Sequence, residues 1–218
     1  FIIQLYTLRS DRSWGIGDFS DLKDLIYLSA ERGAEVIGLN PLHALSVYLE
    51  SHFSPYSPSD RRFISPLYID PELVDDYVNQ VAEKVDQDQL RNARESDKVD
   101  YVAIRNLKYS VYQSMFEQFI AKEIDNQSDR YQEFKGYVES SGSSLRNFAY
   151  FEACHQQWTD AKYVLRYMER QGELEEDLFD LSGALRGARL SMLFHCYLQW
   201  VAASQLSMCH EATVDAGM

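Results

Sequence analysis

A group of polar and aromatic residues between positions 40 and 56 has the side chains that sugar-binding proteins use. Asn40, His43, Ser54 and Tyr56 supply an amide, an imidazole, a hydroxyl and an aromatic ring within one proline-rich segment. Hydrogen bonds from the first three can fix sugar hydroxyls, and an aromatic face covers the apolar C–H side of a sugar ring. The residue types equally allow a second interpretation, in which Tyr56 and His43 only pack the segment against its scaffold.

Three pairs of neighbouring Cys and His residues are the candidates for a metal site: Cys154-His155, His195-Cys196 and Cys209-His210. Adjacent residues on a helix point about 100° apart, and no C-x-x-C or H-x-x-x-H spacing is present. Buried cysteines on helices are common. The sequence therefore predicts structural roles for these residues and no metal site.

Two further motifs are better explained by local structure than by chemistry. Gly15-Ile16-Gly17 lacks the third glycine of a dinucleotide-binding loop, so it predicts a tight turn that lets the backbone pass close to a ligand or to Trp14. Catalytic carboxylates in α/β enzymes lie at strand ends, which makes Asp11, Asp18 and Asp60 worth considering. We expect all three to cap helices or to be solvated.

Composition limits the partners and the compartment. The 218 residues carry 21 Lys and Arg against 34 Asp and Glu, a formal net charge of −13. Binding to nucleic acid or to an anionic membrane needs a clustered positive face, so neither is expected, whereas a neutral sugar is compatible with this charge. The sequence has no uninterrupted run of about 18 apolar residues, so no membrane-spanning helix is predicted. The N-terminus lacks the basic start of a signal peptide. Three scattered cysteines fit a reducing cytoplasm.

Two apolar runs precede the segment that carries the candidate sugar-binding residues. Residues 1–8 and 35–39 are typical of strands buried on both faces. With a helix between them they form a βαβ unit, which implies parallel strands and a right-handed crossover. Residues 40–70, which have no strong period, are interpreted as a long loop after the carboxyl end of the second strand, where α/β proteins place function.

The residues between the two apolar runs predict the connecting helix. Apolar residues recur at helical spacing from Phe19 to Ile26. Asp18 or Ser20 can cap its N-terminus, and Gly33 can follow its C-terminus.

The remainder of the chain has a helical pattern. Asp100 is the predicted N-cap of a helix whose apolar stripe comprises Ile104, Leu107, Val111, Met115 and Phe119. A helix or helix pair is predicted over 145–171 after a break at the serine-rich 140–144, and a last helix over 184–213. The acidic run 173–177 is predicted to begin a solvated helix. The chain is therefore expected to be predominantly helical.

Several separated motifs carry a family resemblance: Gln4–Arg9, Ser13–Phe19, Gly38–Leu45, Ser54–Ser59 with Leu67–Asp70, and Phe194–Trp200. Together they resemble the bacterial 4-alpha-glucanotransferases, the amylomaltase or disproportionating enzyme family, over essentially the whole chain. The chain lacks an initiator Met and the residues that usually precede the first strand in this family. We therefore expect it to be an excised N-terminal piece of the catalytic barrel.

The resemblance implies an α/β fold: the start of a (β/α)8 TIM barrel, with its first two parallel strands and a large, mostly helical insertion. It divides the chain into three parts. Residues 1–70 are the first βαβ unit of the barrel with the substrate loop, residues 71–183 a helical insertion subdomain, and residues 184–218 a helix leading toward the third barrel strand.

The implied reaction moves α-1,4-glucan segments between maltodextrins or starch-derived glucans, with retention through a covalent glycosyl-enzyme. No metal or organic cofactor is implied. The family's catalytic carboxylates lie on later barrel strands, so no catalytic residue is assigned within residues 1–218. By resemblance, Tyr56 lines the sugar-binding cleft, Asn40, His43 and Ser54 shape the same loop, and Trp14 packs under it.

Two alternatives remain open at the level of the sequence. An α-glucan hydrolase of the same barrel clan differs only in whether water or a sugar attacks the intermediate, which nothing in these residues decides. A non-catalytic helical module that binds glycans or a partner would present an exposed apolar stripe on its helices. The oligomeric state is not predicted.

Overall fold

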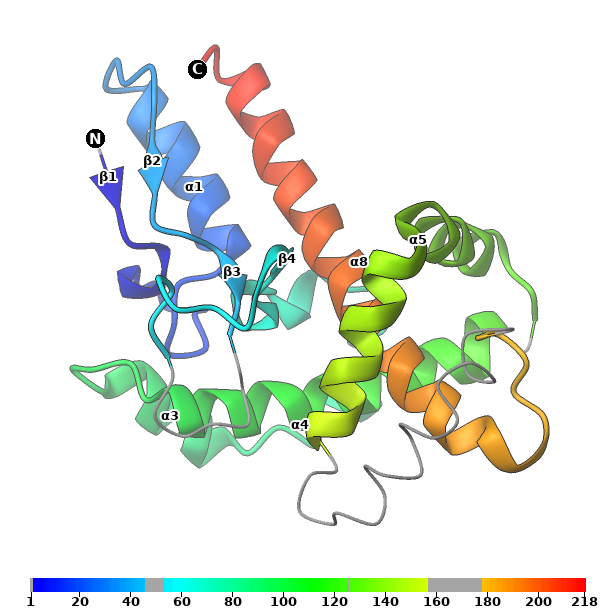
Figure 1. The fold of residues 1–218 in the computed structure, drawn as a ribbon. Coiled ribbons are helices and arrows are strands. Elements are labelled where there is room, and N and C mark those ends of the chain that lie inside the picture. The colour runs from blue at the N-terminus through cyan, green and yellow to red at the C-terminus, as the bar shows by residue number, and fades with distance from the viewer. Residues whose placement is uncertain (1, 46–52, 125, 157–177) are drawn as a thin grey trace. The chain divides into compact units, whose positions relative to one another are not determined.

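The computed structural model describes residues 2–45, 53–124, 126–156 and 178–218 (Figure 1). The chain divides into two compact units. Unit 1 comprises Phe1–Phe119 and Val201–Met218, and unit 2 comprises Ile120–Trp200. Among the described residues, no helix has both the length and the apolar character needed to cross a bilayer.

Unit 1 begins with the predicted βαβ arrangement, drawn in blue in Figure 1. β1 (Ile2–Ile3) and β2 (Gly38–Leu39) pair in parallel, and α1 (Phe19–Ala30) connects them. Asp18 caps α1 as predicted. Its Oδ1 accepts a hydrogen bond from Asp21 N at 3.0 Å, and Asp21 Oδ2 accepts one from Asp18 N at 3.2 Å, which completes a capping box.

Both strands are shorter than predicted. The first ends early because Leu5–Thr7 forms a 3-10 turn, η1, in which Thr7 Oγ1 also donates to Gln4 O at 2.7 Å. In the second run, residues 35–37 are not part of β2, and Val36 is 69% exposed. Apolar content predicted where the strands lie, but their ends depend on which backbone groups a neighbouring strand can reach.

The interpretation of residues 40–70 as one long loop is wrong. β3 (His43–Ala44) and β4 (Asp60–Ile64) form an antiparallel pair, with a register irregularity between His43 and Ala44. The pairing escaped prediction because β3 is too short to show a period-two pattern and β4 begins with three charged residues.

The glycine-rich turn before α1 is tight, as predicted, but its close neighbours are protein backbone and side chain. Gly15 has φ +81°, and a Cβ there would lie 2.7 Å from Ala93 O. A Cβ on Gly17 would collide with Leu5 O. The missing side chains therefore allow the turn to pack against residues 5 and 93.

A series of short elements leads from β4 to a long helix. They are η2 (Pro66–Tyr68), η3 (Pro71–Leu73), α2 (Asn79–Ala82), α3 (Gln87–Glu95) and α4 (Tyr101–Phe119). Asp100 caps α4 by accepting a hydrogen bond from Ala103 N at 3.0 Å, as predicted. All five residues of the predicted apolar stripe of α4 are buried.

Unit 2 is helical. It contains a π-helical turn, η4 (Ile120–Ile124), then α5 (Asp129–Gln156), η5 (Gly183–Leu185) and the first half of α8 (Arg186–Asp215). The predicted break is confirmed at Gly142, where φ 62° and ψ −150° interrupt α5. The last helix is confirmed within two residues at each end. Residues 157–171 of the preceding predicted helix and the acidic run 173–177 lie outside the described residues.

Candidate functional site

Tyr56, the principal predicted sugar-binding residue, lies on the connection between β3 and β4 and is 63% exposed. Ser54 precedes it in an exposed turn, in which Ser57 N donates to Ser54 O at 3.0 Å. Ser59 closes the connection by donating from its N to Ala44 O at 2.9 Å. The tyrosine side chain is thus exposed to solvent on a short segment that backbone hydrogen bonds hold at Ser57 and Ser59.

Asn40 has a different position, buried at the ends of the two parallel strands. Its Oδ1 accepts a hydrogen bond from Leu5 N at 2.8 Å, and its Nδ2 donates to Pro41 O at 2.9 Å. Burial raises the pKa of Tyr68 to about 12, against the opposing effect of a side-chain hydrogen bond with Asn40. Because Asn40 N also donates to Ile3 O at 3.1 Å, Asn40 joins β1, η1 and η2 at this end of the sheet.

His43 and Trp14 occupy separate places. His43 is half-buried in β3, close enough to Asp60 to act on it electrostatically; the pKa of Asp60 is lowered mainly by its hydrogen bond with Arg62. Trp14 is completely buried, and its Nε1 donates to Glu72 Oε1 at 3.0 Å. Its ring meets Tyr77 edge-on at 6.3 Å.

Beside the Tyr56 connection lies an aromatic group that sequence reasoning missed. Phe53 stacks on Tyr101, the first residue of α4, with ring centroids 4.9 Å apart and planes 10° apart. Tyr6 approaches the same ring at 6.4 Å. Burial raises the pKa of Tyr101. Three aromatic residues from distant segments gave no local pattern, because only the fold brings them together.

A second missed feature is a polar cluster around the segment Pro66–Asp70, which we call the hub. Lys108 is completely buried and donates from Nζ to Leu67 O and Ile69 O, each at 2.7 Å. Tyr112 Oη donates to Pro66 O at 2.8 Å. Gln205 of α8 makes two hydrogen bonds with the backbone of Asp70, at 2.8 and 2.9 Å.

The carboxylates of Asp18, Asp21 and Asp70 lie near Lys108, and burial shifts the pKa values of Asp18 and Lys108. Burial raises the pKa of Asp18 to about 6, although the nearby Lys108 opposes this shift. The same burial lowers the pKa of Lys108, opposed by Asp18, Asp70 and Asp21. Lys108 follows Ile104 by four residues and so lies on the same face of α4 as the predicted apolar stripe. A charged residue on an apolar helix face was the signal in the sequence for this cluster.

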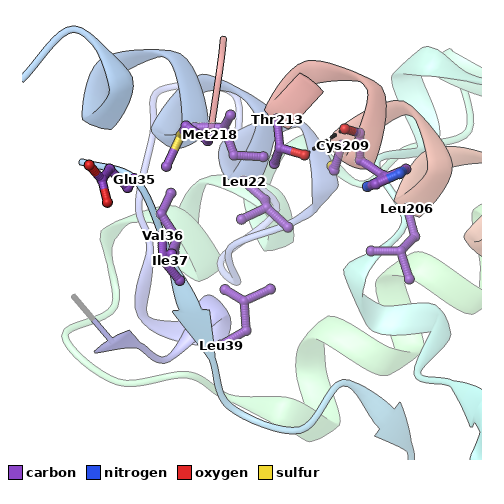
Figure 2. A pocket seen from close by; sticks show the side chains of 11 residues that line it. Leu22, Glu35, Val36, Ile37, Leu39, Leu206, Cys209, Thr213 and Met218 are labelled. Carbon is purple, nitrogen blue, oxygen red and sulfur yellow. Dashed lines mark hydrogen bonds between the residues drawn. The ribbon is translucent and has the colours of Figure 1, made fainter. Parts of the chain in front are cut away.

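A cavity of unit 1 lies elsewhere and is apolar. It has a volume of about 320 Å³ and lies between α1, β2 and the C-terminal half of α8. Figure 2 shows Leu22, Ile37, Leu39 and Leu206 around it, with Glu35 and Thr213 as polar members. None of the five predicted sugar-binding residues lines it. Such a lining offers too few donors and acceptors for sugar hydroxyls.

The cysteines have the surroundings of core residues. All three are free and buried, and burial raises the pKa of Cys196 and Cys209 to about 12. Cys209 Sγ donates to Phe19 O at 3.1 Å, which ties α8 to the start of α1. Within the described ranges, no group of three or more His, Cys, Asp or Glu residues could hold a metal ion.

Comparison with known proteins extends over the whole chain. The family model described as 4-alpha-glucanotransferase matches residues 3–218. The 4-alpha-glucanotransferase of Haemophilus influenzae is 32% identical over 99% of this chain and 32% of its own length. That of Mycobacterium tuberculosis is 28% identical over 99% of this chain and 30% of its own. The chain thus spans about a third of the length of the curated relatives it matches.

Solved structures agree with these relatives. Amylomaltase from Corynebacterium glutamicum superposes with a TM-score of 0.72 at 30% identity, covering 100% of this chain and 28% of that one. Amylomaltase from Streptococcus agalactiae, solved in complex with acarbose, gives a TM-score of 0.68 at 16% identity, covering 100% of this chain and 41% of that one.

Proposed function

Because the chain belongs to the 4-alpha-glucanotransferase family, we propose that it serves in the transfer of α-1,4-glucan segments between maltodextrins. The transfer runs with retention through a covalent glycosyl-enzyme, whose catalytic carboxylates lie outside these 218 residues. The observation that carries this proposal is the match of the family model to residues 3–218. No cofactor enters the proposed reaction.

The proposed architecture is the beginning of a (β/α)8 barrel with a helical insertion. Its support is the parallel pairing of β1 with β2 across α1, which is the repeating unit of such a barrel. We keep the proposed divisions at residues 1–70, 71–183 and 184–218. The three free, buried cysteines support the proposed cytoplasmic location.

We propose that the β3–β4 connection contacts the glucan, with Tyr56 as its aromatic surface. Tyr56 is exposed and follows the carboxyl end of β2, the side on which barrel enzymes place their substrate loops. His43 and Ser54 lie on or beside the same connection. Asn40 contributes by holding the strand ends from which the β3–β4 connection continues. Trp14 contributes by packing under the same loop.

The test is Tyr56→Ala in the enzyme at the full length of its relatives. Loss of a stacked ring and its hydroxyl contact costs on the order of 1–3 kcal/mol of transition-state stabilisation, roughly 5- to 150-fold in kcat/KM with maltotriose. Tyr27→Ala on α1, which is 38% exposed, is the matched control and leaves kcat/KM unchanged. An unchanged kcat/KM in the Tyr56 variant would remove this residue from the site.

Product analysis separates transfer from hydrolysis. Chromatography after incubation with maltotriose should show oligosaccharides longer than the donor, since a sugar hydroxyl attacks the intermediate. Glucose and maltose without longer products would make the enzyme a hydrolase. The 218-residue chain alone should release no glucose from maltotriose, and release would place catalytic carboxylates within it.

A further inference from the structure

Three long side chains of α4 share one face of that helix. Tyr101, Lys108 and Tyr112 are spaced by seven and four residues. At about 100° per residue, seven and eleven steps each return to within about 20° of the starting direction. All three side chains therefore project toward the same side of α4, over roughly three turns.

The first of these residues contacts Phe53, where the described part of the β3–β4 connection before Tyr56 starts. Tyr101 stacks on Phe53, which stands three residues before Tyr56. Near-parallel rings at a 4.9 Å centroid separation bury a large apolar area and restrict the rotation of both side chains.

The other two residues hold the chain where β4 ends. Lys108 donates to Leu67 O and Ile69 O, and Tyr112 donates to Pro66 O. Lys108 and Tyr112 are both fully buried, and every acceptor is a backbone carbonyl. Hydrogen bonds to carbonyls fix the path of the main chain itself, and a charged donor makes them stronger than neutral ones.

A continuous set of backbone hydrogen bonds links this anchored end to Tyr56. Ser65 N donates to Leu42 O at 2.9 Å, the β3–β4 pairing follows, and Ser59 N donates to Ala44 O at 2.9 Å. Ser59 is three residues from Tyr56. Residues 53–65 are therefore held by α4 at both of their ends, while the middle is exposed.

We propose that Tyr101, Lys108 and Tyr112 are positioning residues that hold the β3–β4 connection so that Tyr56 meets the glucan. The inference rests on the proposed function and deepens it. The three residues of α4 contact Phe53 and the segment Pro66–Ile69. We therefore propose that α4 acts on the substrate indirectly, through the geometry of residues 53–65. The large ring of Tyr56 gains its contact only if its backbone is already in place when the sugar arrives.

The test combines a gentle substitution with a double-mutant cycle in the full-length enzyme. Tyr112→Phe removes one hydroxyl and keeps the ring, so the fold is retained. We expect kcat/KM with maltotriose to fall about 3- to 10-fold, chiefly through KM. In the Tyr56→Ala background the same change should lower kcat/KM by less than about 1.5-fold, because the group being positioned is gone. Tyr27→Phe, on α1, is the control and changes neither.

Hydrogen exchange separates the positioning inference from the proposed function. Tyr112→Phe should speed exchange of the Ser59 and Ser65 amides at least about 10-fold while the amides of α1 keep their rates. Unchanged exchange at these amides, or an equal fall in kcat/KM in both backgrounds, overturns the positioning role. Faster exchange with unchanged kcat/KM overturns the contact between the connection and the glucan, and with it the proposed function of Tyr56.

Discussion

Unit 1 and unit 2 differ in what they bury. In unit 1, the buried Lys108, Tyr112 and Gln205 converge on the backbone of the hub, with carboxylates close by. In unit 2, Phe134 is fully buried and meets Phe179 at 6.0 Å and Trp200 at 5.5 Å. The hub of unit 1 is therefore held by hydrogen bonds to the main chain, whereas this cluster of unit 2 is held by contacts between aromatic rings.

This difference matters for the proposed site. Hydrogen bonds to carbonyls have narrow ranges of distance and angle, so they restrict the position of the main chain directly. The connection that carries Tyr56 is anchored in the unit with the directed bonds. A contact with a sugar needs a main chain that is held in place. In this unit the buried charge of Lys108 contributes to holding it.

The largest expected effect is on the hub. Lys108→Met keeps the length of the side chain, but Leu67 O loses its hydrogen bond from Lys108, Ile69 O keeps only the 3.3 Å bond from Tyr112, and the surrounding carboxylates lose the nearby cation. We expect the chain to lose about 3–5 kcal/mol of unfolding free energy, measured by urea denaturation followed by tryptophan fluorescence. The exposed Lys84→Met should lose less than about 0.5 kcal/mol. A loss that small in the Lys108 variant would mean that the hub does not depend on its charge.

The second effect is a response of unit 2 to acid. His195 of α8 is buried, and within the described residues its Nε2 has no hydrogen-bond partner. Burial lowers its pKa from 6.5 to about 3. Between these values only the unfolded chain takes up the proton, so stability falls as the pH drops below 6.5.

The measurement is the unfolding free energy of the chain at pH 7 and pH 4. We expect a loss of about 3 kcal/mol from this histidine. His195→Gln should remove most of that loss, and the exposed His210→Gln should retain it. The same pH dependence in His195→Gln as in the parent chain would contradict burial of a neutral imidazole.

The third effect has the opposite sign and belongs to unit 1. The pKa of Asp18 is raised by burial from 3.8 to about 6, so the folded state takes up this proton first. Stability from this group is therefore complete below pH 3.8 and is lost as the pH rises through 6. Asp18→Asn keeps an N-cap acceptor without the charge.

We expect Asp18→Asn to remove a contribution of about 1–3 kcal/mol from the pH dependence of unit 1 between pH 4 and 7. Thermal unfolding followed at Trp14 across this range is the measurement. Asp11→Asn, at an exposed position, should preserve the dependence. If the Asp18 variant titrates like the parent, another group of the cluster holds the proton.

The smallest effect concerns a single neutral donor. Glu72→Ala removes the acceptor of the buried Trp14 indole, which we expect to cost about 1 kcal/mol. Urea denaturation should show it as a shift in midpoint without a change in slope. An effect above about 3 kcal/mol would mean that Glu72 has a second structural role.

The sequence predicted the elements that depend on local patterns. The helix after Asp18 and the helix after Asp100 have their predicted caps, because a cap and a 3.6-residue apolar period lie within one stretch of chain. The parallel pairing of β1 and β2 followed from the order of elements. Gly142 interrupts α5 where the serine-rich run predicted a break.

The antiparallel β3–β4 pair and the hub could not be predicted in this way. β3 has two residues, too few for a period, and its partner begins 16 residues after it ends. Lys108 meets Leu67 and Ile69 across about 40 positions of sequence. In the sequence a lysine in an apolar stripe is only an exception to the pattern, with no sign of what satisfies it.

By itself, the sequence determined the family and the helices with their caps, because each depends on residue types in short stretches. Tertiary structure alone decided that Asn40 ties strand ends together, that Trp14 bonds to Glu72, and that α4 anchors the β3–β4 connection. The reason is physical. A buried polar group must find its partner in space, and the chain can bring that partner from any distance along the sequence.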